Sequence, residues 1–147
     1  MRNWEAIKLE EHGADAEKTI MTKLPPTLPA LMRAEKVQEK ARRVGFDWED
    51  NQGAWDKVYE ELDELKEAMA QESNVREELG DVLFSVVNIA RFAKVDAETA
   101  LKGTTDKFIR RFQYLEKKAY EEKRELSTYS LSELDRWWDE AKKLETK

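Results

Sequence analysis

Apolar residues recur at helical spacing along most of the chain, and two stripes in its middle are the clearest. One stripe follows an i, i+4, i+7, i+11 pattern, which predicts an amphipathic helix over residues 51–71. It contains Val58, Leu62, Leu65 and Met69. The second stripe begins at residue 75 and contains Val75, Leu79, Val82, Val86, Ile89 and Ala93. Only residues 71–74 separate the two stripes, so we expect an antiparallel helical hairpin with facing seams.

Other segments extend this pattern on both sides of the hairpin. We expect helices over about 30–44, from about 96 to 123, and from Ser130 or Ser132 onwards, where Ser130 and Glu133 form a capping pair. Prolines at positions 25, 26 and 29 exclude a helix interior there. The expected organisation is an N-terminal short helix and proline-containing linker over 1–29, followed by one all-α domain over 30–147, an antiparallel helical bundle.

Composition narrows the class of protein. The 147 residues hold 26 Lys and Arg against 32 Asp and Glu, a net charge of −6, which argues against binding of a nucleic-acid polymer. Cysteine is absent, so disulfides and zinc thiolates are excluded. No apolar run approaches the ~18 residues of a membrane span and no signal-peptide pattern opens the chain, so we expect no membrane partner and a cytoplasmic location.

Two acidic pairs are the candidate chemistry. Glu61 with Glu64, and Glu78 with Asp81, each have i, i+3 spacing and lie on one helix face. Either pair alone would be typical of a solvated helix surface. Together they flank their seams at the same helical angle, so an antiparallel hairpin can bring all four carboxylates to one edge. Such a cluster repels itself unless a cation binds, and all-oxygen ligands favour Mg²⁺ or Mn²⁺.

The arrangement ExxE…ExxD resembles the signature of the MazG-type nucleoside triphosphate pyrophosphohydrolases. Similar stretches surround it: LPALMRAEKVQEKARRVGFDW, EELGDVLFSVVNIAR and KFIRRF. The resemblance covers most of the chain and is closest to the C-terminal MazG domain of the two-domain members. It implies the all-α NTP pyrophosphatase fold, a homodimer, and Mg²⁺-dependent hydrolysis of nucleoside triphosphates, including ATP, to a monophosphate and pyrophosphate. One of the four acids would act as the general base.

The same resemblance implies roles for residues outside the acidic pairs. Lys57, Lys107 and Arg111 are expected to bind phosphates, and Trp138 to pack on the nucleobase. A basic residue common in the family is replaced by Asn74, and Arg76 is the candidate to substitute for it.

Several alternatives stay open at this point. Asn88 either reads the sugar or base or ends a polar stripe, and the Gly45–Trp48 loop, whose expected role is a plug on the core, is otherwise a lid. Specificity is expected to be broad, with a narrow dUTP or dCTP pyrophosphatase as the alternative. A non-catalytic helical interaction module is the competing class, whereas a ferritin-like site would need histidines and only His12 is present. Five tryptophans in a small helical chain favour an apolar dimer interface.

Overall fold

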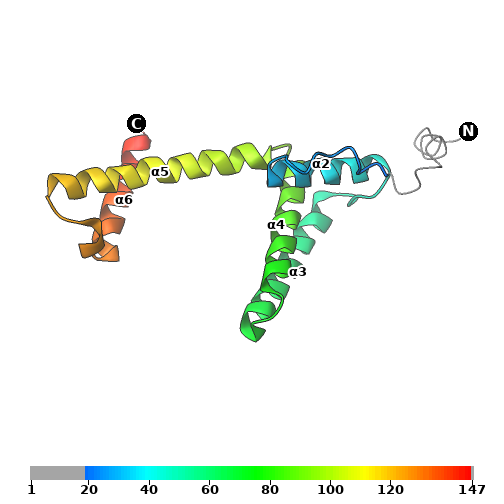
Figure 1. Cartoon of the computed structure of the whole chain (residues 1–147), viewed down its shortest axis with the longest axis horizontal. Helices are drawn as coiled ribbons and strands as arrows, with labels where there is room; N and C mark the ends of the chain where they lie inside the picture. Colours follow the sequence, from blue (N-terminus) through cyan, green and yellow to red (C-terminus); the bar gives the residue numbers. More distant parts are fainter. Residues whose placement is uncertain (1–18, 147) are drawn as a thin grey trace, which may run out of the picture. The chain divides into compact units, whose positions relative to one another are not determined.

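The structure is a computed structural model that describes residues 19–146. The regular elements of the described part are all helices and it contains no strand, which confirms the all-α prediction (Figure 1). In chain order the elements are α2 (Ala30–Arg43), α3 (Asn51–Gln71), α4 (Val75–Phe92), α5 (Ala97–Glu121), the short 3₁₀ helix η2 (Leu126–Thr128) and α6 (Leu131–Glu145). The short helix expected over residues 2–11 lies outside the described residues.

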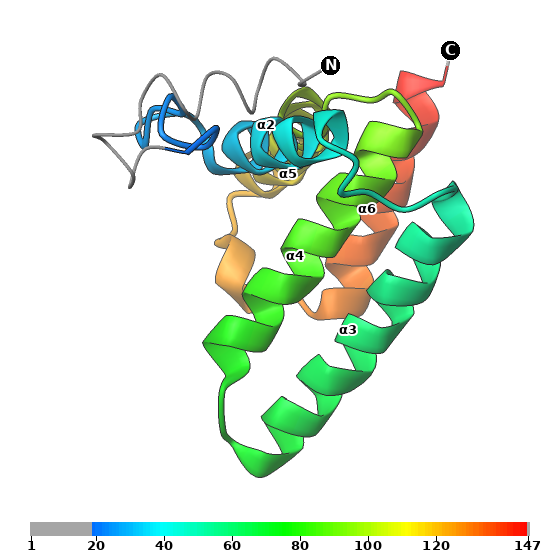
Figure 2. The same ribbon diagram turned by 90° about the vertical axis from the view of Figure 1, so that its right-hand side faces the viewer.

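The chain divides into two compact units, residues 1–98 and residues 99–147, and each is described by itself. In the first unit α3 and α4 form the expected antiparallel hairpin, and α2 packs across α4 (Figure 2). Asp50 caps α3 by accepting hydrogen bonds from the main-chain N–H groups of Gln52 and Gly53 at 3.0 and 3.4 Å. The turn between the two helices places Glu72 and Asn74 in the left-handed region, with φ of 53° and 60°.

The seam of the hairpin differs from the predicted one. The buried apolar residues of α3 and α4 are small or medium-sized: Ala54, Val58, Ala68, Val82 and Val87. The larger members of the predicted stripes remain exposed by 37–61%: Leu62, Met69, Leu79 and Val86. The prediction was therefore right for Val58 and Val82, which are buried, while Leu65 and Ile89 are half-buried and the four larger residues above are exposed. Small side chains let helices approach closely, so the larger neighbours lie beside the contact.

The second unit contains most of α5, η2 and α6. Leu115, Ala119 and Ala141 are buried in it. Aromatic contacts add to this core, with ring centroids 5.1 Å apart for Phe108 and Trp138 and 4.8 Å apart for Tyr129 and Trp137. Ser130 caps α6 as predicted, since its hydroxyl accepts from the Glu133 N–H at 3.2 Å.

None of the helices in residues 19–146 combines the length and apolar character that crossing a membrane requires. The cytoplasmic location stays a prediction.

Candidate functional site

Three carboxylates from the α3–α4 hairpin meet at one edge. Glu61 on α3 and Glu78 and Asp81 on α4 each offer an oxygen, and these oxygens lie within 4.8 Å of one another. The Glu61 side chain is only 7% exposed. One oxygen of Glu61 and one of Glu78 (both Oε2) are buried and have no hydrogen-bond partner within the described part of the chain. Burying a carboxylate oxygen without a partner is unfavourable unless a ligand binds it. Three clustered carboxylates, two of which have such an oxygen, therefore fit a hard cation.

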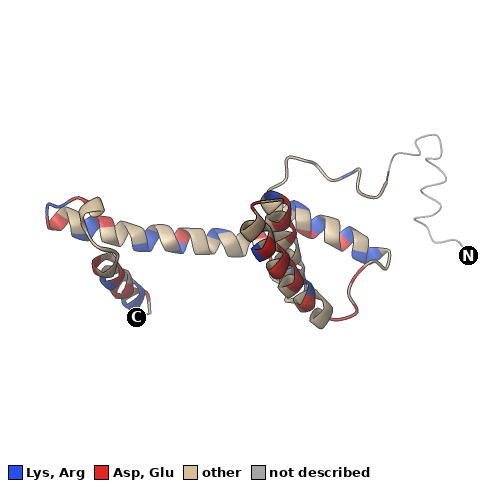
Figure 3. Ribbon diagram, turned by 90° about the horizontal axis from the view of Figure 1, so that it is seen from below, with Lys and Arg blue, Asp and Glu red and all other residues tan. Residues whose placement is uncertain are grey.

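Glu64 and Lys57 belong to the same electrostatic group. Glu64 is exposed, and the negative charge of Glu61 is the main cause that raises the pKa of Glu64, with Glu78 contributing. Lys57 Nζ lies 3.0 Å from Glu61 Oε1 and 3.5 Å from Glu60 Oε1. The hydrogen bond to Glu61 raises the pKa of Lys57 and keeps it charged. Figure 3 shows how acidic residues accumulate along this hairpin.

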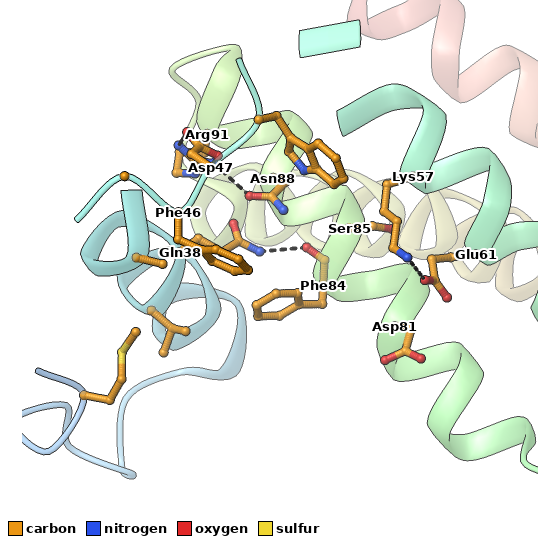
Figure 4. Close-up of a pocket in the computed structure, with 15 residues that line it drawn as sticks. Gln38, Phe46, Asp47, Lys57, Glu61, Asp81, Phe84, Ser85, Asn88 and Arg91 are labelled. Carbon is orange, nitrogen blue, oxygen red and sulfur yellow. Dashed lines mark hydrogen bonds and ion pairs between the residues drawn. The ribbon is translucent and has the colours of Figure 1, made fainter. Parts of the chain in front are cut away.

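A cavity of about 670 Å³ opens beside the acidic cluster, within the size range of small-molecule sites. It lies in the first unit, and Figure 4 shows Lys57, Glu61 and Asp81 at one end and Gln38 and Phe46 at the other. Its lining comes from α2, the following loop, α3 and α4: Met21, Val37, Gln38, Ala41, Gly45, Phe46, Asp47, Trp48, Lys57, Glu61, Asp81, Phe84, Ser85, Asn88 and Arg91. The cavity therefore combines acids, one lysine, amides and aromatic rings.

An ion pair holds the loop after α2 against α4. Arg91 binds Asp47 through both carboxylate oxygens, with 3.0 Å from Nη1 to Oδ2, and both side chains are largely buried at 9% and 16% exposure. This hydrogen bonding lowers the pKa of Asp47. Arg91 Nη2 also donates to Asn88 Oδ1 at 3.0 Å, which fixes the orientation of the Asn88 amide. Asn88 therefore lines the cavity in a defined orientation.

The aromatic residues of this loop do not form the expected core plug. Phe46 is 81% exposed and Trp48 is 42% exposed, although both line the cavity. Trp48 packs on Gly53 of α3, where an added Cβ would lie 2.9 Å from its ring. The plug prediction is wrong because Arg91 anchors the loop at its acidic residue and the aromatic residues stay at the cavity rim.

Sequence reasoning overlooked Gln38, Asp47 and Arg91. Gln38 is 5% exposed, lines the cavity and donates from Nε2 to the Phe84 carbonyl at 2.9 Å. A signal was available for this residue, since Gln38 interrupts the apolar face that Ala34 and Ala41 share on the first predicted helix. The Asp47–Arg91 pair had no such signal, because 44 residues separate its members.

The other predicted site residues lie elsewhere. Arg76 is exposed in the first turn of α4 and does not line the cavity. Lys107, Arg111 and Trp138 belong to the second unit. There Arg111 donates to Glu145 Oε2 at 3.1 and 2.8 Å and lies 5.7 Å from the Trp138 ring centroid. This pairing lowers the pKa of Glu145. The roles of all predicted site residues stay predictions.

Comparison with known proteins bears on this arrangement. Residues 50–115 match the MazG nucleotide pyrophosphohydrolase domain, a range that includes both acidic pairs. The chain carries a MazG domain. It is 42% identical over 141 residues to the "Nucleoside triphosphate pyrophosphohydrolase/pyrophosphatase MazG" of Thermotoga maritima, covering 96% of this chain and 54% of that protein.

Two further relatives extend the comparison. The chain is 38% identical over 149 residues to the Escherichia coli K12 "Nucleoside triphosphate pyrophosphohydrolase", covering 99% of this chain and 57% of that protein. It is 46% identical over 148 residues to the Bacillus subtilis "Uncharacterized protein YabN", covering 30% of that protein. The chain thus spans about half the length of the first two relatives and less of the third.

Proposed function

We propose that this chain is a Mg²⁺-dependent nucleoside triphosphate pyrophosphohydrolase of broad specificity. The observation that carries the proposal is the meeting of Glu61, Glu78 and Asp81 oxygens within 4.8 Å, beside a cavity that Glu61 and Asp81 also line. The names of the Thermotoga maritima and Escherichia coli relatives support the same reaction.

Four carboxylates would hold the ion: Glu61, Glu64, Glu78 and Asp81. Their oxygens suit Mg²⁺, with Mn²⁺ as a substitute, and the two unpartnered buried oxygens of Glu61 and Glu78 support a cation rather than a hydrogen-bond network there. When bound, the ion would neutralise charge on the phosphate oxygens.

The remaining chemistry belongs to the chain's own residues. Lys57 neutralises Glu61 across 3.0 Å and is placed to turn to a phosphate oxygen when substrate enters. One of the four carboxylates would take a proton from a water, whose oxygen forms the new bond to the α-phosphorus. The bond from that phosphorus to the bridging oxygen breaks, and pyrophosphate leaves with the electron pair. The products are a nucleoside monophosphate and pyrophosphate.

Residues outside the cavity complete the proposal. Lys107 and Arg111 would contact the phosphates, with Arg76 as a further cation, and Trp138 would pack on the base. For Arg111 this means leaving Glu145, which it binds at 2.8 Å. An exposed phosphate tail offers the guanidinium a stronger charge than one carboxylate does.

The test is pyrophosphate release from ATP, GTP, CTP, UTP and their deoxy forms in Mg²⁺, with product identity checked by chromatography. Wild-type protein should produce the monophosphate from all of them, and Asp81→Ala should produce none while keeping its helical circular dichroism. Glu60→Gln is the matched control, since Glu60 is an exposed acid on the same helix and is outside the cluster.

Other outcomes separate the alternatives. Turnover of one deoxynucleotide alone would favour a narrow dUTP or dCTP pyrophosphatase. An absence of turnover with every triphosphate in Mg²⁺ or Mn²⁺ would favour a non-catalytic helical module.

A homodimer is part of the proposal. The α3–α4 hairpin leaves large apolar side chains exposed by 37–51%: Trp55, Leu62, Leu79, Leu83 and Val86. Apolar surface of this kind usually marks an interface, and a second copy with the same face can cover it. Light scattering at micromolar concentration should report a dimer, and a monomer would contradict this part of the proposal.

A further inference from the structure

In the side-chain amide of Gln38, the nitrogen has a hydrogen-bond partner among the described residues and the oxygen has none. Its Nε2 donates to the Phe84 main-chain carbonyl at 2.9 Å. Its Oε1 is buried and has no hydrogen-bond partner among the described residues. The orientation is unambiguous, because a carbonyl only accepts hydrogen bonds and the nitrogen must face it. Gln38 therefore has an unpaired hydrogen-bond acceptor although the residue is only 5% exposed.

Gln38 belongs to the same cavity as the acidic cluster. Gln38 lines it together with Glu61, Asp81 and Lys57, and Figure 4 shows Gln38 at the end opposite these three residues. If the triphosphate lies at the acidic end, the nucleoside extends towards Gln38. The aromatic side chains of Phe46 and Phe84 line the cavity beside it and offer apolar surface to a flat ring. The surroundings thus match a nucleobase better than a charged group.

We propose that Gln38 Oε1 accepts a hydrogen bond from an N–H group on the edge of the nucleobase, an inference that rests on the proposed function. Adenine and cytosine carry an exocyclic amino group there, and guanine carries amino and ring N–H groups. Uracil carries a ring N–H. A single acceptor therefore tolerates the four common bases and discriminates against a base that lacks any N–H on this edge. Asn88, whose Oδ1 is held by Arg91, leaves its amide nitrogen as a complementary donor.

A hydrogen bond from Gln38 reads the edge of the base and leaves the face of the base free for stacking. It gives Gln38 a role in specificity and not in bond breaking. The fixed amide is the distinguishing feature: a freely turning glutamine would pair with donors and acceptors equally, whereas Gln38 cannot turn without losing the Phe84 carbonyl.

The experiment compares ATP with purine riboside triphosphate, which has hydrogen in place of the 6-amino group. Binding of the non-hydrolysable α,β-methylene forms is measured by calorimetry in Mg²⁺, and kcat and KM are measured for the natural linkages. In the wild type, ATP should bind about tenfold or more tightly, because the analogue leaves the acceptor unpaired. The difference should appear in KM and hardly in kcat. In Gln38→Leu, which has similar size and no acceptor, the preference should fall towards one.

Gln71→Leu is the matched control, since Gln71 is exposed at the end of α3 and lies outside the cavity. It should keep the wild-type preference. Equal binding of the two ligands by the wild type would overturn the proposal and assign Oε1 to a bound water, and this result needs no variant. A preference that survives in Gln38→Leu would also overturn it. If the proposed function is wrong, neither triphosphate will release pyrophosphate. The calorimetric comparison of the two ligands still tests the role of Gln38 in that case.

Discussion

Replacing Glu61 by Gln isolates the charge of the most buried acid in the cluster. Glutamine has nearly the same size, so the packing of a side chain with 7% exposure is preserved. Without a divalent ion the variant lacks the charge that repels Glu64 and Glu78, which favours the folded state. It also loses the pairing with Lys57, which is 38% exposed, so that loss is about 0–1 kcal/mol. We therefore expect little change in melting temperature in EDTA.

Addition of the divalent ion should raise the melting temperature of the wild type more than that of Glu61→Gln. An ion that binds only the folded state at 100 times its Kd adds about 2.7 kcal/mol to the free energy of unfolding. For a chain of 147 residues each kcal/mol raises the melting temperature by about 2–4 °C, so the wild type should gain about 5–11 °C. If the loss of one charged ligand weakens binding about 100-fold, the same ion concentration adds about 0.4 kcal/mol, or about 1 °C.

The assay is scanning calorimetry in EDTA and then in rising MgCl₂, repeated with MnCl₂. Glu60→Gln removes the same charge from the neighbouring, 57% exposed position and should keep the full wild-type gain. An equal gain in Glu61→Gln and the wild type would refute the placement of the ion at Glu61. No gain in any of the three proteins would refute a divalent site in this fold.

Three more predictions test other parts of the molecule. Trp138→Ala should raise KM about 5–150-fold for purine and pyrimidine triphosphates alike, with kcat less affected. Trp137→Ala should instead lower the melting temperature and leave KM nearly unchanged. The reverse pattern would exchange the roles of the two tryptophans. Gly80→Ala should raise the melting temperature by about 2–4 °C, from about 1 kcal/mol of helix propensity, because an added Cβ would meet no atom of residues 19–146 within 4 Å. Destabilisation would indicate a second copy packed close to Gly80. Asp47→Asn should lower the free energy of unfolding by about 1.5–3 kcal/mol at neutral pH in chemical denaturation. Because Arg91 lowers the pKa of Asp47, this deficit should be full above about pH 4 and shrink as pH falls further; a constant deficit would contradict the pairing.

Local signals in the sequence were sufficient for the helices of the hairpin. The predicted range 51–71 agrees with α3, and the second stripe agrees with α4 to within one residue at its end. Helical periodicity and capping depend on residues only a few positions apart, so both can be read directly from the sequence. The same periodicity predicts Glu61, Glu64, Glu78 and Asp81 on one edge, and oxygens of Glu61, Glu78 and Asp81 lie within 4.8 Å of one another there, whereas Glu64 is not part of this close group. The acidic cluster was therefore predictable because it needs only two helices and one short turn.

Tertiary structure decided which residues fill the seam and what surrounds the cluster. Ala54 and Ala68 are buried while Leu62 and Met69 are exposed, because the closeness of two helices depends on both surfaces together. Gln38 meets the Phe84 carbonyl across 46 residues of sequence, and Asp47 meets Arg91 across 44. Hydrogen bonds between residues so far apart leave no periodic trace in the chain. They exist only once α2 and its following loop pack on α4, and that packing leaves the buried amide oxygen of Gln38 without a partner in residues 19–146.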